Sequence, residues 1–165
     1  MPHRKRMLIY GYGNPGRQDD GLGAAFIRKM EVWLKDHPMP GLNLDCNYQL
    51  NIEDAEIIAH KDIVIFVDAT VEDIEHFHFS KVEPSAAKVE FTMHAVSPSF
   101  VVDLCRKMFH VAPETYLLHI KGYEWDFKEA LSEAASENLE MAFRFIIDKL
   151  QGQLTFDEAV LQQNK

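Results

Sequence analysis

The sequence has few cysteines, no long apolar run and few basic residues. Its two cysteines, Cys46 and Cys105, lie far apart in the chain, and no window approaches the roughly 20 apolar residues of a membrane-spanning helix. Lysine and arginine number 17 against 26 acidic residues, which gives a net charge of −9. These absences argue against a disulfide-stabilised secreted domain, membrane insertion and a nucleic-acid-binding surface. We therefore expect a reduced, cytoplasmic protein.

The length and composition predict one globular domain. With 165 residues, of which 47% are hydrophobic, the chain can bury one sizeable core but not two. We expect a single domain over residues 1–165 with its core in 7–150, and a tail, 151–165, that is loosely held.

Short β-like runs alternate with helical periodicities, which is typical of an α/β fold. The predicted strands lie near 7–12, 43–49, 62–69, 76–83 and 115–121. The pattern predicts a three-layer α/β/α domain whose twisted, predominantly parallel sheet has about five strands. Helices are predicted between the first two strands, after Ser97-Pro98 and after Ser132, because Ser and Pro are favoured at helix starts.

A glycine-rich turn follows the first predicted strand. Gly11, Gly13 and Gly16 satisfy the spacing of a dinucleotide-binding loop, but the turn closes on Asp19 and Asp20. Two negative charges there would repel a phosphate and attract a cation. The turn therefore favours a metal or another electropositive group.

Three polar side chains follow predicted strands at the edge where ligands bind in open α/β sheets. Asp20 follows the first strand, Asp68 ends the apolar run 63–67, and His94 precedes the helix that starts after Ser97. Two carboxylates and an imidazole can hold a divalent ion such as Ni²⁺ or Zn²⁺ and leave coordination positions open. Each residue also has a purely structural interpretation: Asp20 as a helix cap, Asp68 as a partner of a loop amide, His94 as a surface histidine.

Several blocks along the chain match a known pattern in order. They are Gly11-Tyr12-Gly13-Asn14 with Asp19-Asp20-Gly21-Leu22-Gly23, Gln49-Leu50 with Glu53, Val64-Ile65-Phe66-Val67-Asp68-Ala69, His94 with Ser97-Pro98, and Gly122 with Leu131-Ser132. From about Met7 to about Leu150 the chain resembles the hydrogenase maturation proteases, endopeptidases that process the large subunit of [NiFe] hydrogenases.

The resemblance implies a function and a site. It implies that Asp20, Asp68 and His94 are the metal-contacting residues. His110, the nearest histidine downstream, is the substitute for His94 if the match is shifted at that block. It also implies that the divalent metal is nickel supplied by the substrate protein, and that the partner is a large-subunit precursor whose C-terminal extension is removed. Asp20 or Asp68 would activate water as a general base, or the metal would polarise the scissile carbonyl.

Two other functions stay open at the level of sequence. A nucleotide- or flavin-binding module would use the three glycines without hydrolysis, although no acidic residue stands at the end of the second predicted strand for the ribose. A metal-sensing partner that docks on the nickel subunit without cutting it would keep the same three candidate residues.

Overall fold

A computed structural model describes residues 5–84, 96–152 and 155–163. Its elements are β1 (Met7–Tyr12), a 3-10 helix η1 (Gln18–Gly21), α1 (Leu22–Asp36), β2 (Leu42–Asn47), α2 (Asp54–Ala59), β3 (Ile63–Thr70), β4 (Phe77–Lys81), α3 (Pro98–Phe109), β5 (Glu114–Lys121), α4 (Glu133–Gln151) and α5 (Phe156–Gln163). The predicted α/β fold is confirmed, and all five predicted strands are present.

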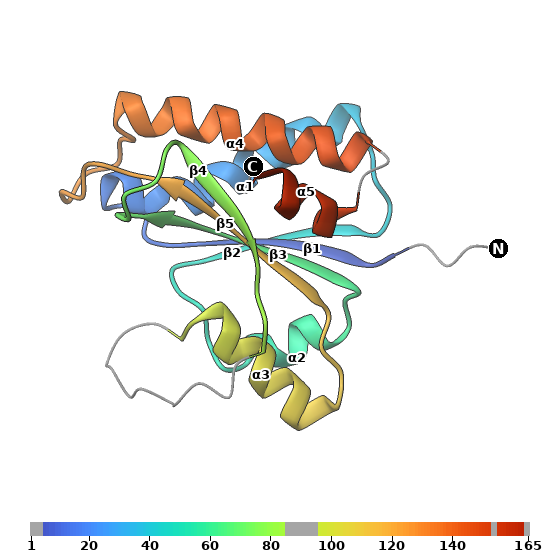
Figure 1. Cartoon of the computed structure of the whole chain (residues 1–165). Helices are drawn as coiled ribbons and strands as arrows, with labels where there is room; N and C mark the ends of the chain where they lie inside the picture. Colours follow the sequence, from blue (N-terminus) through green and yellow to red (C-terminus); the bar gives the residue numbers. More distant parts are fainter. Residues whose placement is uncertain (1–4, 85–95, 153–154, 164–165) are drawn as a thin grey trace.

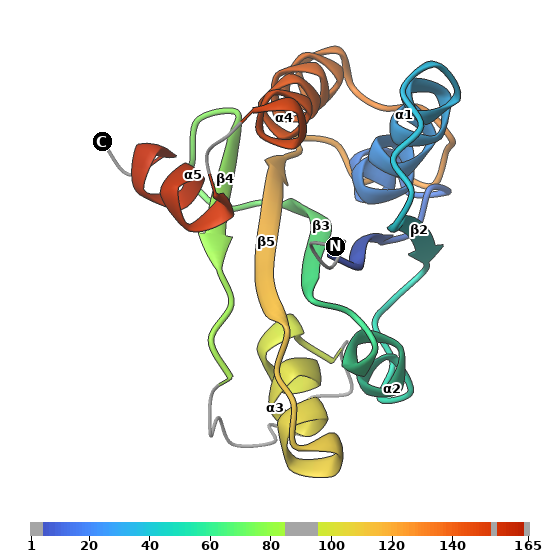
Figure 2. The same cartoon turned by 90° about the vertical axis from the view of Figure 1, so that its right-hand side faces the viewer.

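The five strands form one mixed sheet in the order β2-β1-β3-β5-β4. The first four strands in this order are parallel, and β4 runs antiparallel to β5 at the edge. Helices α1, α4 and α5 cover one face of the sheet, and α2 and α3 cover the other (Figure 1). Figure 2, turned by 90° about the vertical axis, shows the same two helical layers, with α1, α4 and α5 on one side and α2 and α3 on the other.

Each face of the sheet has its own apolar core because side chains alternate along each strand. Ile65 of β3 packs on the α1 side with Phe26, whereas Phe66, its neighbour, packs on the α2 and α3 side with Val101. β3 is buried on both faces over Ile63–Val67, which explains its unbroken apolar run.

The predicted helix starts are confirmed by their capping contacts. Ser97 accepts a hydrogen bond from the Phe100 amide at 3.2 Å, and Ser132 accepts one from the Ala135 amide at 3.2 Å. α1 buries Leu22, Phe26 and Met30 at helical spacing against the sheet.

The expectation of a loosely held tail is wrong for residues 155–163. α5 buries Phe156 and Ala159 against the sheet, and the Phe156 ring lies 6.1 Å from Phe79 and 5.6 Å from Tyr116 between centroids. Tyr116 also donates a 2.7 Å hydrogen bond to Asp157. The tail thus covers β4 and β5, the strands that would otherwise expose these aromatic rings.

Candidate functional site

The site lies where the chain changes direction across the sheet. β1 is central and pairs with β2 on one side and β3 on the other, while α1 and α2 cover opposite faces. Such a switch point leaves a crevice outside the carboxyl ends of the two middle strands. η1, which follows β1, brings Asp20 to this edge, and Asp68 lies near the end of β3.

Close backbone contact holds the glycine-rich turn against the sheet. A Cβ atom on Gly23 would lie 2.6 Å from the Tyr12 carbonyl oxygen and 2.7 Å from that of Val67. Gly13 adopts φ +132°, and a Cβ there would lie 2.1 Å from the Asp20 carbonyl oxygen. The glycines therefore allow α1 to start directly above β1 and β3, and this approach carries Asp20 toward Asp68.

Asp20 fixes the turn and does not cap a helix. Its Oδ2 accepts a 2.8 Å hydrogen bond from the Asn14 amide, and its side chain is half-buried. The N-cap of α1 is Gly21, which has no side-chain cap. The helix-cap interpretation of Asp20 is thus wrong.

Asp68 is the titrating group of the site. Burial, followed by the negative charge of Asp20, raises its pKa from 3.8 to about 7, while hydrogen bonds from the Ala69 amide and the Tyr12 hydroxyl oppose the shift. Burial and the Asp68 charge in turn raise the pKa of Tyr12, so this hydroxyl stays protonated and donates. Two carboxylates that share a site in this way take up a proton or a cation readily.

Asp19, the neighbour of Asp20, has a structural role. Its side chain is fully buried and accepts hydrogen bonds from the amides of Tyr123, Glu124 and Ser132 and from the Ser132 hydroxyl, at 2.7–2.9 Å. Burial raises the pKa of Asp19, but these four donors outweigh it and lower the pKa overall. Of the two adjacent aspartates, one therefore anchors the loop after β5 and the other faces Asp68.

Two histidines of the far strands align with Asp68. His119 of β5 pairs in register with Asp68, and His78 of β4 pairs with His119. Aligned residues of neighbouring strands share a sheet face, so both imidazoles belong to the face that carries Asp68. Burial, together with the proximity of His78, lowers the pKa of His119, which is therefore neutral at pH 7. These two histidines are 41 positions apart in the sequence, and only strand pairing brings them into line with Asp68.

Of the three predicted site residues, the structure brings Asp20 and Asp68 together. His94 lies outside the described residues. His110 forms the C-cap of α3 and precedes the amino end of β5, at the edge opposite Asp68. Within 5–84, 96–152 and 155–163, no cluster of three His, Cys, Asp or Glu side chains could hold a metal ion. The described part of the site is thus a pair of carboxylates, which fits a metal that is also held by other ligands.

The cysteines do not supply a nucleophile at this site. Burial raises the pKa of both the Cys46 and the Cys105 thiol, so neither is an activated thiolate. Among the described helices, none is long and apolar enough to cross a bilayer.

Comparison with known proteins identifies the fold. No protein-family model and no curated protein sequence matches the chain. A [NiFe] hydrogenase maturation protease, HycI, from Thermococcus kodakarensis KOD1 matches in structure with a TM-score of 0.70 and 21% identity, covering 92% of this chain and 96% of that one. The hydrogenase maturating endopeptidase HybD from E. coli matches with a TM-score of 0.68 and 16% identity, and the match covers 88% of this chain and 92% of that one. A hydrogenase 2 maturation peptidase from a Thaumarchaeota archaeon matches with a TM-score of 0.62 and 20% identity, and the match covers 89% of this chain and 99% of that one. The chain therefore has the fold of the [NiFe] hydrogenase maturation proteases over nearly its whole length.

Proposed function

We propose that this chain is an endopeptidase that removes the C-terminal extension of a [NiFe] hydrogenase large-subunit precursor after recognising its inserted nickel. One observation carries the proposal: in a chain with the fold of these peptidases, Asp20 follows β1 and Asp68 lies near the end of β3, close enough for the charge of Asp20 to raise the pKa of Asp68. The carboxyl ends of these strands form the edge at which α/β sheets bind their ligands.

The carboxylate pair suits recognition of a metal that arrives with the partner. Asp20 and Asp68 repel each other when both are ionised, and a cation between them replaces that repulsion with attraction. In the proposal His94 completes the contacts to the nickel. Because the pair alone is an incomplete ligand set, binding depends on the ligands that the precursor contributes, so an unloaded precursor binds poorly.

Asp68 is the candidate general base in this proposal. Without a bound cation its pKa is about 7, so a substantial fraction is ionised at neutral pH; a cation beside it would increase that fraction, and the ionised carboxylate can accept a proton from water. The water oxygen then attacks the scissile carbonyl carbon, the peptide C–N bond breaks, and the leaving amine takes up the proton that Asp68 accepted from the water, which returns Asp68 to its ionised form. The nearby Tyr12 hydroxyl favours the ionised form of Asp68 and partly offsets the effect of burial.

The proposed function predicts nickel-dependent cleavage. Purified protein is incubated with the large-subunit precursor from the same organism, with and without nickel loaded, and the precursor is analysed by intact mass. We expect loss of the C-terminal extension from the nickel-loaded precursor alone. Absence of cleavage with both forms would contradict a peptidase, and equal cleavage of both would contradict nickel recognition.

A further inference from the structure

The loop between β5 and α4 presents two aromatic side chains to solvent. We call residues 122–132 the aromatic loop. Phe127 is 87% exposed and Tyr123 is 48% exposed. The loop projects at the end of the sheet where α1 begins, as the orange segment in Figure 1 shows. Single exposed apolar residues are ordinary, but two aromatic rings on one loop beside a candidate site mark a surface for binding.

The aromatic loop is held in place by the segment that carries Asp20. Besides the four donors to Asp19, the Gln18 amide donates to the Lys128 carbonyl at 2.9 Å, and the Gln18 side-chain oxygen accepts from the Asp126 amide at 3.0 Å. The Arg17 guanidinium lies 5.1 Å from the centre of the Phe127 ring. A side chain that is exposed on a fixed loop loses little conformational freedom when a partner covers it.

A second exposed loop, residues 71–76 after β3, adjoins the aromatic loop. Lys121 donates from its amine to the Val71 carbonyl at 2.8 Å, and the Gly122 amide donates to Thr70 at 3.0 Å. Asn138 of α4 joins the two loops, since it donates to the Tyr123 hydroxyl and contacts the His76 ring nitrogen, both at 2.9 Å. Val71, at the start of this second loop, is 71% exposed and adds an apolar side chain to the surface.

The rim of this surface is strongly acidic. Six exposed carboxylates belong to the two loops: Glu72, Asp73, Glu75, Glu124, Asp126 and Glu129. Three cations accompany these six carboxylates: Lys121 donates to main-chain carbonyls of Val71 and Glu72, Arg17 donates to the Trp125 carbonyl, and Lys128 of the aromatic loop is exposed. The excess of negative charge favours a partner surface with lysine or arginine around an apolar centre.

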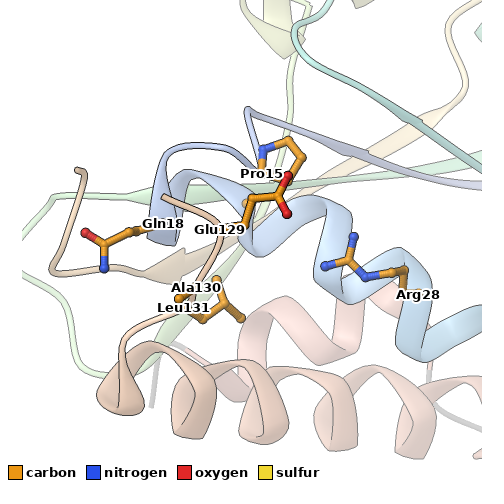
Figure 3. A pocket seen from close by; sticks show the side chains of 7 residues that line it. Pro15, Gln18, Arg28, Glu129, Ala130 and Leu131 are labelled. Carbon is orange, nitrogen blue, oxygen red and sulfur yellow. The ribbon is translucent and has the colours of Figure 1, made fainter. Parts of the chain in front are cut away.

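A cavity of about 340 Å³ opens at the base of the aromatic loop. It lies between the start of α1 and the segment that leads into α4, and Figure 3 shows Pro15, Glu129 and Leu131 around it, with Arg28 further along α1. This is the lower end of the size range of pockets that accept a ligand group. Its mixed apolar and charged lining can receive one side chain of a bound protein.

We infer that the aromatic loop, together with residues 71–76, is the docking surface for the hydrogenase large-subunit precursor, and that the precursor meets it with an apolar centre ringed by basic residues. The inference rests on the proposed function and adds a surface outside the carboxylate pair. Phe127 is the anchor of this surface, because exposed aromatic side chains that become fully covered carry much of the energy of protein interfaces. Docking there holds the precursor beside Asp20 and Asp68, since residues 17–19 support both features.

The test is Phe127→Ala, with Leu161→Ala of α5 as the matched control. Leu161 is 65% exposed but belongs to the helix that covers β4 and β5. Binding of each variant to nickel-loaded precursor is measured by calorimetry, and cleavage by intact mass. We expect Phe127→Ala to weaken binding about tenfold or more, to raise KM and to leave kcat unchanged, because a docking residue acts before the chemical step. Leu161→Ala is expected to match the wild type.

The acidic rim is tested separately with Asp73→Asn/Glu75→Gln. This double variant is expected to slow association with the precursor several-fold at low salt and to weaken its salt dependence. Asp148→Asn, at an exposed position of α4, is the control. An unchanged association rate in the double variant would overturn the assignment of a basic partner surface.

The results separate the docking surface from the function itself. Wild-type protein that neither binds nor cleaves the nickel-loaded precursor would overturn both proposals. Wild-type cleavage with unchanged affinity and KM in Phe127→Ala would overturn the docking surface alone. Because Phe127 is almost fully exposed, its truncation should leave the thermal midpoint unchanged, and a lower kcat without a change in KM would also overturn the docking role.

Discussion

Asp20 and Asp68 come from separate parts of the chain and lie close enough for the charge of Asp20 to raise the pKa of Asp68. The contact exists because η1 and the start of α1 sit directly on β1 and β3, where Gly23 leaves no room for a side chain. This relationship shows that the two carboxylates influence each other's ionisation, and it can be measured without any substrate.

The first prediction concerns the pKa of Asp68 itself. Asp20→Asn removes the neighbouring negative charge, so the pKa of Asp68 should fall from about 7. Carboxyl-carbon NMR titration measures this directly. Burial is the larger cause of the shift and is retained in the variant, so the pKa should stay above the ordinary value of 3.8. A titration curve identical to that of the wild type would show that the two carboxylates do not interact.

The raised pKa of Asp68 also makes the stability of the protein depend on pH. A carboxyl group with a raised pKa in the folded state binds more protons folded than unfolded, so it lowers the free energy of unfolding as pH rises from about 4 to about 7. Asp68→Asn removes this loss. Urea denaturation should show the variant about 1–3 kcal/mol more stable than the wild type at pH 8, with the difference shrinking toward pH 4. Equal stability at both pH values would contradict the raised pKa.

Asp19 should behave in the opposite way to Asp68. Asp19→Asn weakens four hydrogen bonds to a buried carboxylate, so we expect the free energy of unfolding to fall by about 2–4 kcal/mol at pH 7. The pKa of Asp19 is lowered in the folded state, so its contribution is present at neutral pH and is lost as pH falls through that pKa. Denaturation at pH 7, with exposed Asp148→Asn as the control, measures the effect. A loss no greater than in the control would contradict the anchoring role.

The glycine-rich turn gives a prediction about packing. Gly23→Ala would place a Cβ within 2.7 Å of two main-chain carbonyl oxygens, whereas Gly16→Ala in the same turn meets only the Asn14 side chain, at 3.2 Å. Gly23→Ala should therefore destabilise the protein by about 2 kcal/mol or more, and Gly16→Ala by much less. Thermal unfolding of the two variants makes the comparison. Equal midpoints would show that α1 does not press on the strands as the structure has it.

Much of this fold could be predicted from local sequence. Periodicity located the five strands because β3 has an unbroken apolar run over Ile63–Val67 and the others are bounded by turns. Serine caps located α3 and α4. α5 was missed because its burial depends on Phe79 and Tyr116, which lie on strands far away in the chain, and a short helix with two buried residues has a weak periodic signal.

The site was predictable only in part, because some of its features are local in the sequence and others depend on contacts between distant residues. Strand ends and a switch point are readable from sequence, and they pointed to Asp20 and Asp68. Asp19 accepts hydrogen bonds from residues 123–124 and from Ser132, which lie more than 100 positions further along the chain. Local sequence therefore could not show that Asp19 is structural and that Asp20 is the candidate site residue. His78 and His119 align with Asp68 only through strand pairing. Such non-local contacts leave no mark in the local pattern.

The most direct test of the account compares the wild type, Asp20→Asn and Asp68→Asn on nickel-loaded large-subunit precursor, with Asp148→Asn as the control. The rate at which the C-terminal extension is lost is followed by intact mass, after each variant is shown to be folded. Loss of a general base or of a metal contact predicts a rate at least about a hundredfold lower for Asp68→Asn, and a clear loss for Asp20→Asn. Cleavage by Asp68→Asn at the wild-type rate would contradict the account.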